Sequence, residues 1–306
     1  LSLHDALPIL MNIVIVGGGA TGIEVAGILS EMKKFVLPKD YPDMPSSLMH
    51  IYLIEAGPRL LAGMSEESSA HAEQFLREMG VNILLNKRVV DYRDHKVVLE
   101  DGTEIATRTF IWVSGVTGVT IGNMDPSLIG RGGRIKVDSF NRVEGMSNVF
   151  AIGDQCIQVA DEDYPNGHPQ LAQVAIQQGE LLAKNLVRME KGREMKPFHY
   201  RNLGSMATVG RNRAVAEFSK VKMQGWFAWV MWLVVHLRSI LGVRNKVIVL
   251  LNWVWNYFTY DQSMRMIVYA RKAKEIRDRE KVEETTHWGK ELIQEEKNPS
   301  TTSSSK

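Results

Sequence analysis

Short apolar runs alternate with longer helical stretches through the first part of the chain. Runs at residues 12–16, 50–54, 81–85, 97–99 and 110–113 predict strands, whereas residues 21–35 and the stretch from Ser65 predict helices. Glu66 and Glu67 stand at the start of the second helix, where the helix dipole favours acidic side chains. Three prolines predict a loop over residues 37–47. Because strands alternate with helices, we expect a right-handed, mostly parallel α/β arrangement.

The pattern changes further along. Residues 135–137 and 211–218 predict strands, and residues 170–190 predict a long helix. Beyond Gly225, two apolar runs rich in tryptophan are separated by His236, Arg238, Arg244 and Lys246. Neither run reaches the roughly 18–20 residues that a membrane-spanning helix needs. We therefore expect amphipathic helices lying on a membrane surface, with a buried helical hairpin as the alternative.

The amino-acid composition excludes one class of flavoprotein, the dithiol–flavin reductases. The 306 residues suit one large domain or two smaller ones. The net charge of +2 argues neither for nor against nucleic acid, and no nucleic-acid partner is expected. The single cysteine, Cys156, excludes an internal disulfide and a CxxC pair, and therefore a dithiol–flavin reductase. A packing role is the favoured interpretation of Cys156, with a redox thiol as the alternative. No metal-ligand set is expected.

The run IVIVGGGATGIEVAG carries a dinucleotide-binding pattern. Gly17, Gly19 and Gly22 have GxGxxG spacing between a predicted strand and a predicted helix. This spacing predicts a tight turn at the first glycine, close approach of a pyrophosphate at the second, and close helix–strand packing at the third. Glu55 ends the second predicted strand, where a carboxylate accepts from the adenosine ribose hydroxyls and repels a 2′-phosphate. The pattern favours NADH over NADPH; a glycine-rich turn without a ligand is the alternative.

A second motif, NVFAIGDQ, covers residues 148–155. We interpret it as an apolar strand that ends at Gly153 and Asp154, which suit a flavin ribityl chain. A protein that holds both NADH and a flavin needs two pyrophosphate-binding loops, and this sequence has one. We therefore expect the chain to be the later portion of a flavoprotein, preceded by a non-native or irregular leader at residues 1–10.

Taken with TFIWVSGV (109–116), QLAQVAIQQG (170–179), GSMATVGRNRAVAEF (204–218) and NKVIVLLNWVWNYFTYDQSMR (245–265), the two motifs resemble those of the type II NADH dehydrogenases. The resemblance covers roughly residues 11–268. It implies an α/β flavoprotein with two dinucleotide-binding domains and C-terminal amphipathic membrane helices. The expected parts are an NADH-binding Rossmann domain (11–117), the later part of an FAD-binding domain (118–218), a membrane-associating segment (219–270) and a charged tail (271–306).

The resemblance also implies roles for individual residues. Glu24, in what the sequence suggests is the first turn of a helix, would handle protons between flavin and nicotinamide; the alternative is a carboxylate favoured by the helix dipole. Ser114 and Gly115 would lie beside NADH, unless they only close a buried strand.

Gln173 and Gln177 share one helix face and would lie beside the isoalloxazine ring and the quinone, with Gln178 also binding the cofactor. A solvated polar face is the alternative. Leu203 departs from the family pattern, in which many members have lysine, and Arg201 is a candidate replacement for that cation.

The implied activity is hydride transfer from NADH to FAD and electron transfer to a membrane quinone, menaquinone or ubiquinone, without proton pumping. The expected location is monotopic, on the cytoplasmic face of a bacterial inner membrane, in contact with the bilayer surface, and a homodimer is left open. Two alternatives stay open as well: a truncated NADH-binding module without stable FAD, and a soluble NADH:acceptor flavoprotein reductase.

Overall fold

The computed structural model describes residues 11–119, 121–219, 221–240 and 242–259. The chain divides into two units, residues 1–250 and 251–306. Of the second unit, only the last turns of one helix are described. The expected leader at residues 1–10, the end of the expected membrane segment and the charged tail at 271–306 lie outside the described residues.

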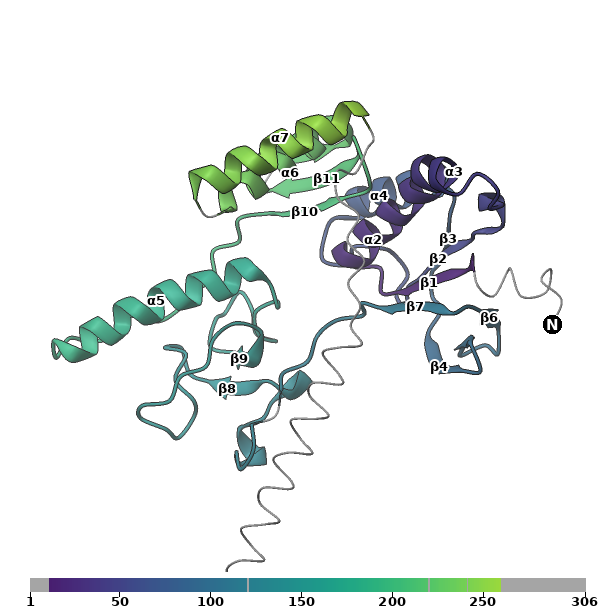
Figure 1. Ribbon diagram of the computed structural model, residues 1–306. Coiled ribbons are helices and arrows are strands. Elements are labelled where there is room, and N and C mark those ends of the chain that lie inside the picture. The colour runs from purple at the N-terminus through teal and green to yellow at the C-terminus, as the bar shows by residue number, and fades with distance from the viewer. Residues whose placement is uncertain (1–10, 120, 220, 241, 260–306) are drawn as a thin grey trace, which may run out of the picture. The chain divides into compact units, whose positions relative to one another are not determined.

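A four-stranded parallel sheet forms the centre of the first part of the chain (Figure 1). Its strands are β1 (Ile13–Val16), β2 (Ile51–Ile54), β3 (Val81–Leu84) and β7 (Thr109–Trp112), in the order β3-β2-β1-β7. All three neighbouring pairs are parallel. The parallel arrangement predicted from the alternating pattern is therefore confirmed.

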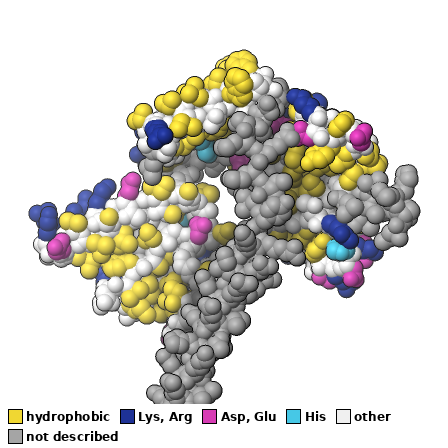
Figure 2. Space-filling view, viewed as in Figure 1, with side chains coloured by type: hydrophobic (Ala, Val, Ile, Leu, Met, Phe, Trp, Pro, Cys, Tyr) yellow, Lys and Arg dark blue, Asp and Glu magenta, His cyan; other side chains and the backbone are white. Residues whose placement is uncertain are grey.

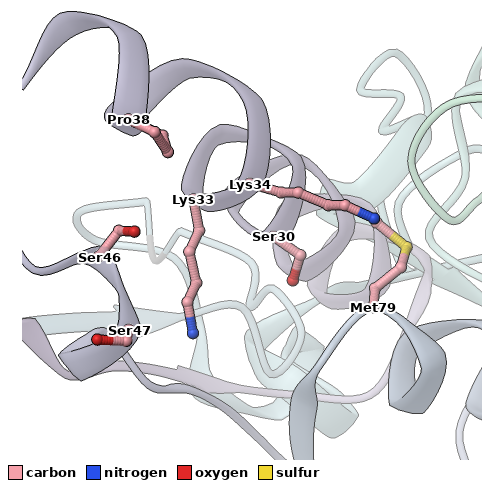
Figure 3. A pocket seen from close by; sticks show the side chains of 7 residues that line it. All are labelled: Ser30, Lys33, Lys34, Pro38, Ser46, Ser47 and Met79. Atoms are coloured by element: carbon pink, nitrogen blue, oxygen red, sulfur yellow. The ribbon is translucent and has the colours of Figure 1, made fainter. Parts of the chain in front are cut away.

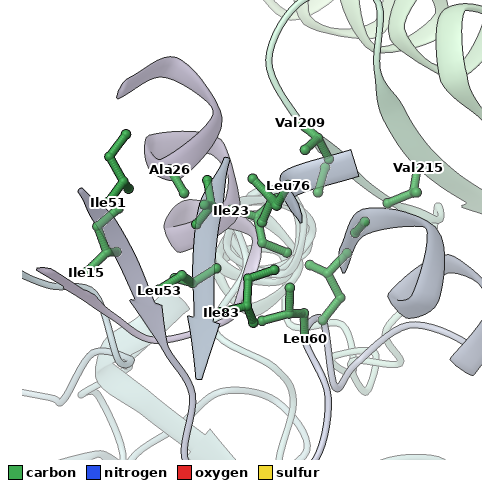
Figure 4. Close-up of a cluster of buried hydrophobic side chains, with 14 of the residues drawn as sticks. Ile15, Ile23, Ala26, Ile51, Leu53, Leu60, Leu76, Ile83, Val209 and Val215 are labelled. Atoms are coloured by element: carbon green, nitrogen blue, oxygen red, sulfur yellow. The ribbon is translucent and has the colours of Figure 1, made fainter. Parts of the chain in front are cut away.

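The two faces of this sheet are covered by different structures. Residues alternate between the faces, as in any strand. Ile15, Ile51 and Leu53 pack with helices α2 (Ala20–Glu31) and α4 (Glu66–Glu78), as Figure 4 shows. Val14 and Ile54 pack on an antiparallel meander of β4 (Val89–Arg93), β5 (Lys96–Leu99) and β6 (Glu104–Ala106). Full burial of one such Ile or Leu contributes about 1.5–3 kcal/mol to stability.

The connection from α2 to β2 is more helical than the prolines predicted. After α2 the chain continues as a π-helical stretch η1 (Met32–Val36), then α3 (Leu37–Asp40), and a short 3₁₀ turn η2 (Ser46–Leu48) precedes β2. The predicted loop over 37–47 is thus wrong at its start. Pro38 lies in the first turn of α3, directly after the π-helical stretch, where proline is tolerated better than in a helix interior.

A hollow of about 310 Å³ lies beside this connection (Figure 3). Lys33, Lys34, Ser46 and Ser47 are among its lining residues. Lys33 Nζ already donates to the carbonyl of Met49 at 2.5 Å. None of the predicted site residues lines this hollow, so it is not part of the candidate site.

The middle of the chain is built from short elements and one long helix. They are η3 (Pro126–Leu128), η4 (Arg131–Gly133), β8 (Ile135–Val137), η5 (Gly153–Gln155), β9 (Cys156–Gln158) and α5 (Ala172–Glu190), with β8 parallel to β9. The predicted strand at 148–152 is wrong. Phe150 makes a single isolated bridge with Arg142, and the adjoining bonds run only to residues 141–143, so no ladder forms there.

An antiparallel sheet and two helices complete the described residues. The strands are β10 (Ser205–Thr208), β11 (Ala214–Phe218) and β12 (Val221–Gln224), and the helices are α6 (Gly225–Ser239) and α7 (Val243–Thr259). The β11–β12 hairpin crosses the boundary expected between residues 218 and 219. Apolar side chains are exposed along both helices, and Figure 2 shows apolar side chains gathered over α7. No helix among the described residues is long and apolar enough to cross a membrane.

A carboxylate fastens the antiparallel sheet to the first turn of α4. Glu217 on β11 accepts from the hydroxyl of Ser68 at 2.6 Å, from the backbone N–H of Ser65 at 3.0 Å and from the Ser65 hydroxyl. Ser65 is also the N-cap of α4, and its side chain accepts from the N–H of Ser68. Burial alone would raise the pKa of Glu217, but the donors of Ser65 and Ser68 outweigh it and hold the pKa below its ordinary value.

The lowered pKa gives a pH-dependent stability. Above pH 4.5, the ordinary value, the charged Glu217 contributes its full stabilisation, which is lost as the pH falls through the lowered pKa of the folded state. We expect Glu217→Ala to lower the free energy of unfolding at pH 7 by about 2 kcal/mol, because hydrogen bonds to a charged group contribute about 1.5–3 kcal/mol. Urea denaturation between pH 3 and pH 7 measures this, with the exposed Glu180→Ala as control. A difference between Glu217→Ala and wild type that does not shrink at low pH would contradict the assignment.

Candidate functional site

The glycine loop between β1 and α2 has the geometry of a pyrophosphate-binding turn. Gly17 has φ of +115°, and a Cβ there would meet Val113 O at 2.8 Å. A Cβ at Gly22 would lie 1.9 Å from the carbonyl oxygen of Gly17, so only glycine lets α2 approach the strand. A Cβ at Gly19 would meet nothing within 4 Å, which leaves open space at the position expected for the pyrophosphate. The N-terminus of α2 has no side-chain cap, and free N–H groups there attract anions.

Glu55 lies directly after β2 and is tied to this loop. Its Oε2 accepts from the backbone N–H of Gly18 at 2.6 Å, and its Oε1 accepts from the N–H of Gly57 at 2.7 Å. The carboxylate therefore sits at the carboxyl edge of the sheet, beside the glycine turn, which is where open α/β sheets bind ligands. Both oxygens are already oriented by backbone donors.

Ser114 and Gly115 follow β7 at the same edge. A Cβ at Gly17 would lie 2.9 Å from the Cα and the N of Ser114, so the turn after β1 and the turn after β7 are in contact. Gly115 has φ of +90°, which favours glycine. Trp112, the last residue of β7, is 55 % exposed. The structure thus brings Gly17, Ser114 and Glu55 to one edge.

Glu24 lies in the second turn of α2, not in the first, because the helix begins at Ala20. The dipole explanation for this carboxylate is correspondingly weaker, since that effect is confined to the first turn. Glu24 Oε1 accepts from the backbone N–H of Thr208 on β10 at 3.4 Å. Burial raises the pKa of Glu24, while the Thr208 N–H and the charge of His236 act in the opposite direction.

The GD motif and α5 form a second group of predicted residues. Gly153 has φ of +66°, and a Cβ there would approach Ala175 Cβ to 3.2 Å. Its backbone N–H donates to Gln178 Oε1 at 2.7 Å. Gln178 is 1 % exposed, so this amide supports the motif from behind. Asp154, by contrast, is exposed.

Cys156 packs beneath the same motif. Its thiol is buried and donates to the carbonyl of Gly153 at 3.5 Å. Burial raises the pKa of this thiol, which keeps it protonated and unreactive. These contacts agree with a packing role.

Gln173 and Gln177 face the extended segment that follows α5. Gln177 accepts from the N–H of Arg201 at 3.0 Å and donates to the Arg201 carbonyl at 2.9 Å. Gln173 accepts from the N–H of Leu203 at 3.2 Å and donates to the carbonyl of Gly204 at 3.0 Å. Both amides are therefore engaged with backbone, and the alternative of a merely solvated face does not apply. Leu203 itself is 56 % exposed.

Two residues that support the site were not predicted from the sequence. Gln155 donates to the carbonyl of Val119 at 2.6 Å and accepts from the Val119 N–H at 2.9 Å, joining the GD turn to the chain that follows β7. Buried Asn185 was missed too, although an asparagine inside a helix is unfavourable unless its side chain is used. Among the residues that the structure describes, no three His, Cys, Asp or Glu side chains are grouped to hold a metal ion.

Two family models match the chain. The model described as pyridine nucleotide-disulphide oxidoreductase matches residues 3–179, and the model of the NDH2 C-terminal domain matches residues 202–260. The first match covers the glycine turn and the GD motif. The second begins within the segment that Gln173 and Gln177 hold and runs through α6 and α7.

Curated relatives point to the same family. A type II NADH:quinone oxidoreductase, NdhA of Mycobacterium tuberculosis (strain ATCC 25618 / H37Rv), is 35 % identical over 256 residues, which are 79 % of this chain and 53 % of the relative. An internal alternative NAD(P)H-ubiquinone oxidoreductase A1, mitochondrial, of Arabidopsis thaliana is 31 % identical over 265 residues, 81 % of this chain and 51 % of the relative. The chain spans about half the length of the curated relatives it matches.

The fold has a solved counterpart. The structure of NDH2 from Plasmodium falciparum in complex with NADH superposes with a TM-score of 0.76 at 18 % identity, covering 85 % of this chain and 68 % of that one. At this identity the match shows the fold. The two family models and the 35 % identical relative show that the chain belongs to the pyridine nucleotide-disulphide oxidoreductase family and, within it, to the type II NADH dehydrogenases.

Proposed function

We propose that this chain provides the NADH-binding and acceptor-side portions of an FAD-dependent NADH:quinone oxidoreductase. The observation that carries the proposal is the contact between Glu55 and Gly18, because a carboxylate beside a glycine turn with open space at Gly19 is what ribose and pyrophosphate binding require. Relatives named as NADH:quinone oxidoreductases support the reaction class.

On the NADH side, each group has a distinct task. The free N–H groups at the start of α2 and the space at Gly19 receive the pyrophosphate. Glu55 accepts from the adenosine ribose hydroxyls and repels a 2′-phosphate. Ser114, which touches the glycine turn, and the following Gly115 line the same edge and contact the nicotinamide half of the nucleotide.

On the flavin side, the exposed carboxylate of Asp154 accepts from a ribityl hydroxyl, and Gly153 allows the chain to approach. Gln178 keeps the motif in place through the Gly153 N–H. When bound, FAD supplies the hydride acceptor. Gln173 and Gln177 lie beside the ring and the quinone, and Glu24 holds a proton at its half-buried carboxyl group.

We propose in addition that α6 and α7 attach the protein to the cytoplasmic surface of a bacterial inner membrane. Trp226, Phe227 and Val234 on α6 are exposed, as are Val247 and Leu250 on α7. Exposed apolar side chains on helices too short to span a bilayer suit burial at the acyl boundary. The basic side chains Arg238, Arg244 and Lys246 then meet anionic lipid.

The test uses purified protein supplied with FAD. We expect the protein to show the absorbance of bound flavin, to oxidise NADH with menaquinone or ubiquinone analogues, and to float with anionic liposomes. NADH binding without flavin would leave only an NADH-binding module, and quinone activity without flotation would indicate a soluble reductase. Mass measurement in solution tests the homodimer. Failure of NADH to bind at all would end the proposal.

Glu55 sets the choice of coenzyme. We expect Glu55→Gln to raise the affinity for NADPH relative to NADH by about tenfold, because it removes the charge that repels the 2′-phosphate. Calorimetric titration of both nucleotides measures the ratio. The exposed Glu66→Gln on α4 is the charge-matched control, and an unchanged ratio in Glu55→Gln would remove Glu55 from the ribose site.

Glu24 should make the quinone-dependent rate vary with pH. Because burial raises the pKa of its carboxyl above the ordinary 4.5, the group retains its proton to higher pH and loses it as the pH rises through the raised value. A proton donor must carry its proton, so the quinone-dependent rate falls across that interval. We expect Glu24→Gln to abolish this limb of the pH–rate profile and to lower kcat by about 100-fold. A profile that keeps the limb in the variant would assign it to another group.

A further inference from the structure

The chain between α5 and β10 has an unusual way of pairing its backbone. Residues 196–204 form neither a helix nor a strand. Side chains of α5 nevertheless make hydrogen bonds with the backbone of these residues, as a neighbouring strand would. Asn185, Gln177 and Gln173 each bind one backbone N–H and one backbone carbonyl of this segment, which we name the paired segment. The N–H donors belong to Lys196, Arg201 and Leu203 and the carbonyls to Lys196, Arg201 and Gly204, at 2.8–3.2 Å.

The spacing explains why one helix can do this. Four residues of α-helix advance about 6 Å along the axis. Two residues of extended chain advance about 6.6 Å. Gln173 and Gln177, four apart on α5, therefore match Leu203 and Arg201, two apart on the paired segment. A slip by one residue would remove every one of these bonds at once.

The opposite side of the paired segment is fixed by a buried acid. Asp161 is 3 % exposed, and its Oδ2 accepts from the N–H of Tyr200 at 3.1 Å and contacts His168 Nε2 at 2.9 Å. The rings of Phe198 and Tyr200 lie 5.2 and 6.0 Å from the His168 ring. The N–H of Phe198 donates to the carbonyl of Ser139 at 2.7 Å.

Buried and exposed side chains alternate over residues 197–201, in the middle of the paired segment. Phe198 and Tyr200 are buried, whereas His199 and Arg201 are exposed. The end nearest β10 presents Arg201 and the apolar Leu203 beside the two glutamines. The far end is held by Asn185, which is 1 % exposed and lies eight residues, or about 12 Å, from Gln177 along α5.

We propose that the paired segment is a rigid wall of the electron-acceptor pocket and that Asn185 is a positioning residue for it. Asn185 acts through the backbone: it fixes Lys196, and the alternating buried rings carry that register to Arg201 and Leu203. Asp161 holds the same register from the other side. The inference rests on the proposed function, which places Gln173 and Gln177 beside flavin and quinone.

The first test separates the acceptor pocket from the NADH side. In protein loaded with FAD, we expect Asn185→Leu to raise the KM for a short-chain ubiquinone analogue about tenfold, because a buried hydrogen-bonded amide is lost at the anchor. Flavin reduction by NADH and ferricyanide reduction should stay at the wild-type rate. Lys184→Ala, an exposed neighbour on α5, should match wild type. An unchanged quinone KM, or an equal loss in all three assays, would overturn the inference.

The second test does not depend on catalysis. In Asn185→Leu, the amide hydrogen of Arg201 should exchange faster even though its acceptor, Gln177, is intact. Asn185→Asp still accepts from the Lys196 N–H but cannot donate to the Lys196 carbonyl. It should therefore change the exchange rate and the quinone KM less than Asn185→Leu does. It is also the variant to measure if Asn185→Leu does not fold. Slow exchange at Arg201 in the variants would overturn the inference. Wild-type protein without quinone activity would instead refute the proposed function.

Discussion

A backbone N–H that is not paired within a helix or a sheet still needs an acceptor, and in this protein the acceptor is repeatedly a carboxylate or an amide side chain. Glu55 takes the N–H of Gly18, Gln178 takes that of Gly153, and Glu217 takes that of Ser65. Each of these bonds lies where a turn or loop must hold a defined shape. These side-chain acceptors hold the glycine turn after β1, the turn at Gly153 and the start of α4, where no strand or helix supplies a backbone partner for the N–H.

The sequence was sufficient for the parts of the fold that follow from periodicity. The apolar runs gave the four strands of the parallel sheet and the helices that cover it, and the glycine spacing gave the turn whose close approaches the structure displays at Gly17 and Gly22. These features are local, so a short window contains their cause. The meander of β4, β5 and β6 was only partly anticipated, because four of the five residues of β4 are exposed and β6 is only three residues long, so their apolar signal is weak.

The features that the sequence did not predict depend on contacts between distant residues or on neighbouring elements of the fold. The apolar run at 148–152 looks like a strand, but strand formation requires a partner ladder, which the residues described do not supply. Proline usually indicates the end of a helix, but Pro38 lies at the start of α3, where it is compatible with the helix. The tie between Ser65 and Glu217 joins positions 152 residues apart, and nothing in either neighbourhood signals the other.

The two bonds of Glu55 make its carboxylate part of the structure of the glycine turn. The N–H groups of Gly18 and Gly57 orient this carboxylate, so the binding of a ribose there, as proposed, would cost little conformational entropy. The same arrangement constrains evolution. If Glu55 selects the coenzyme as proposed, a lineage that adapts to a phosphorylated ribose cannot simply discard this acid, because two peptide groups would lose their acceptor.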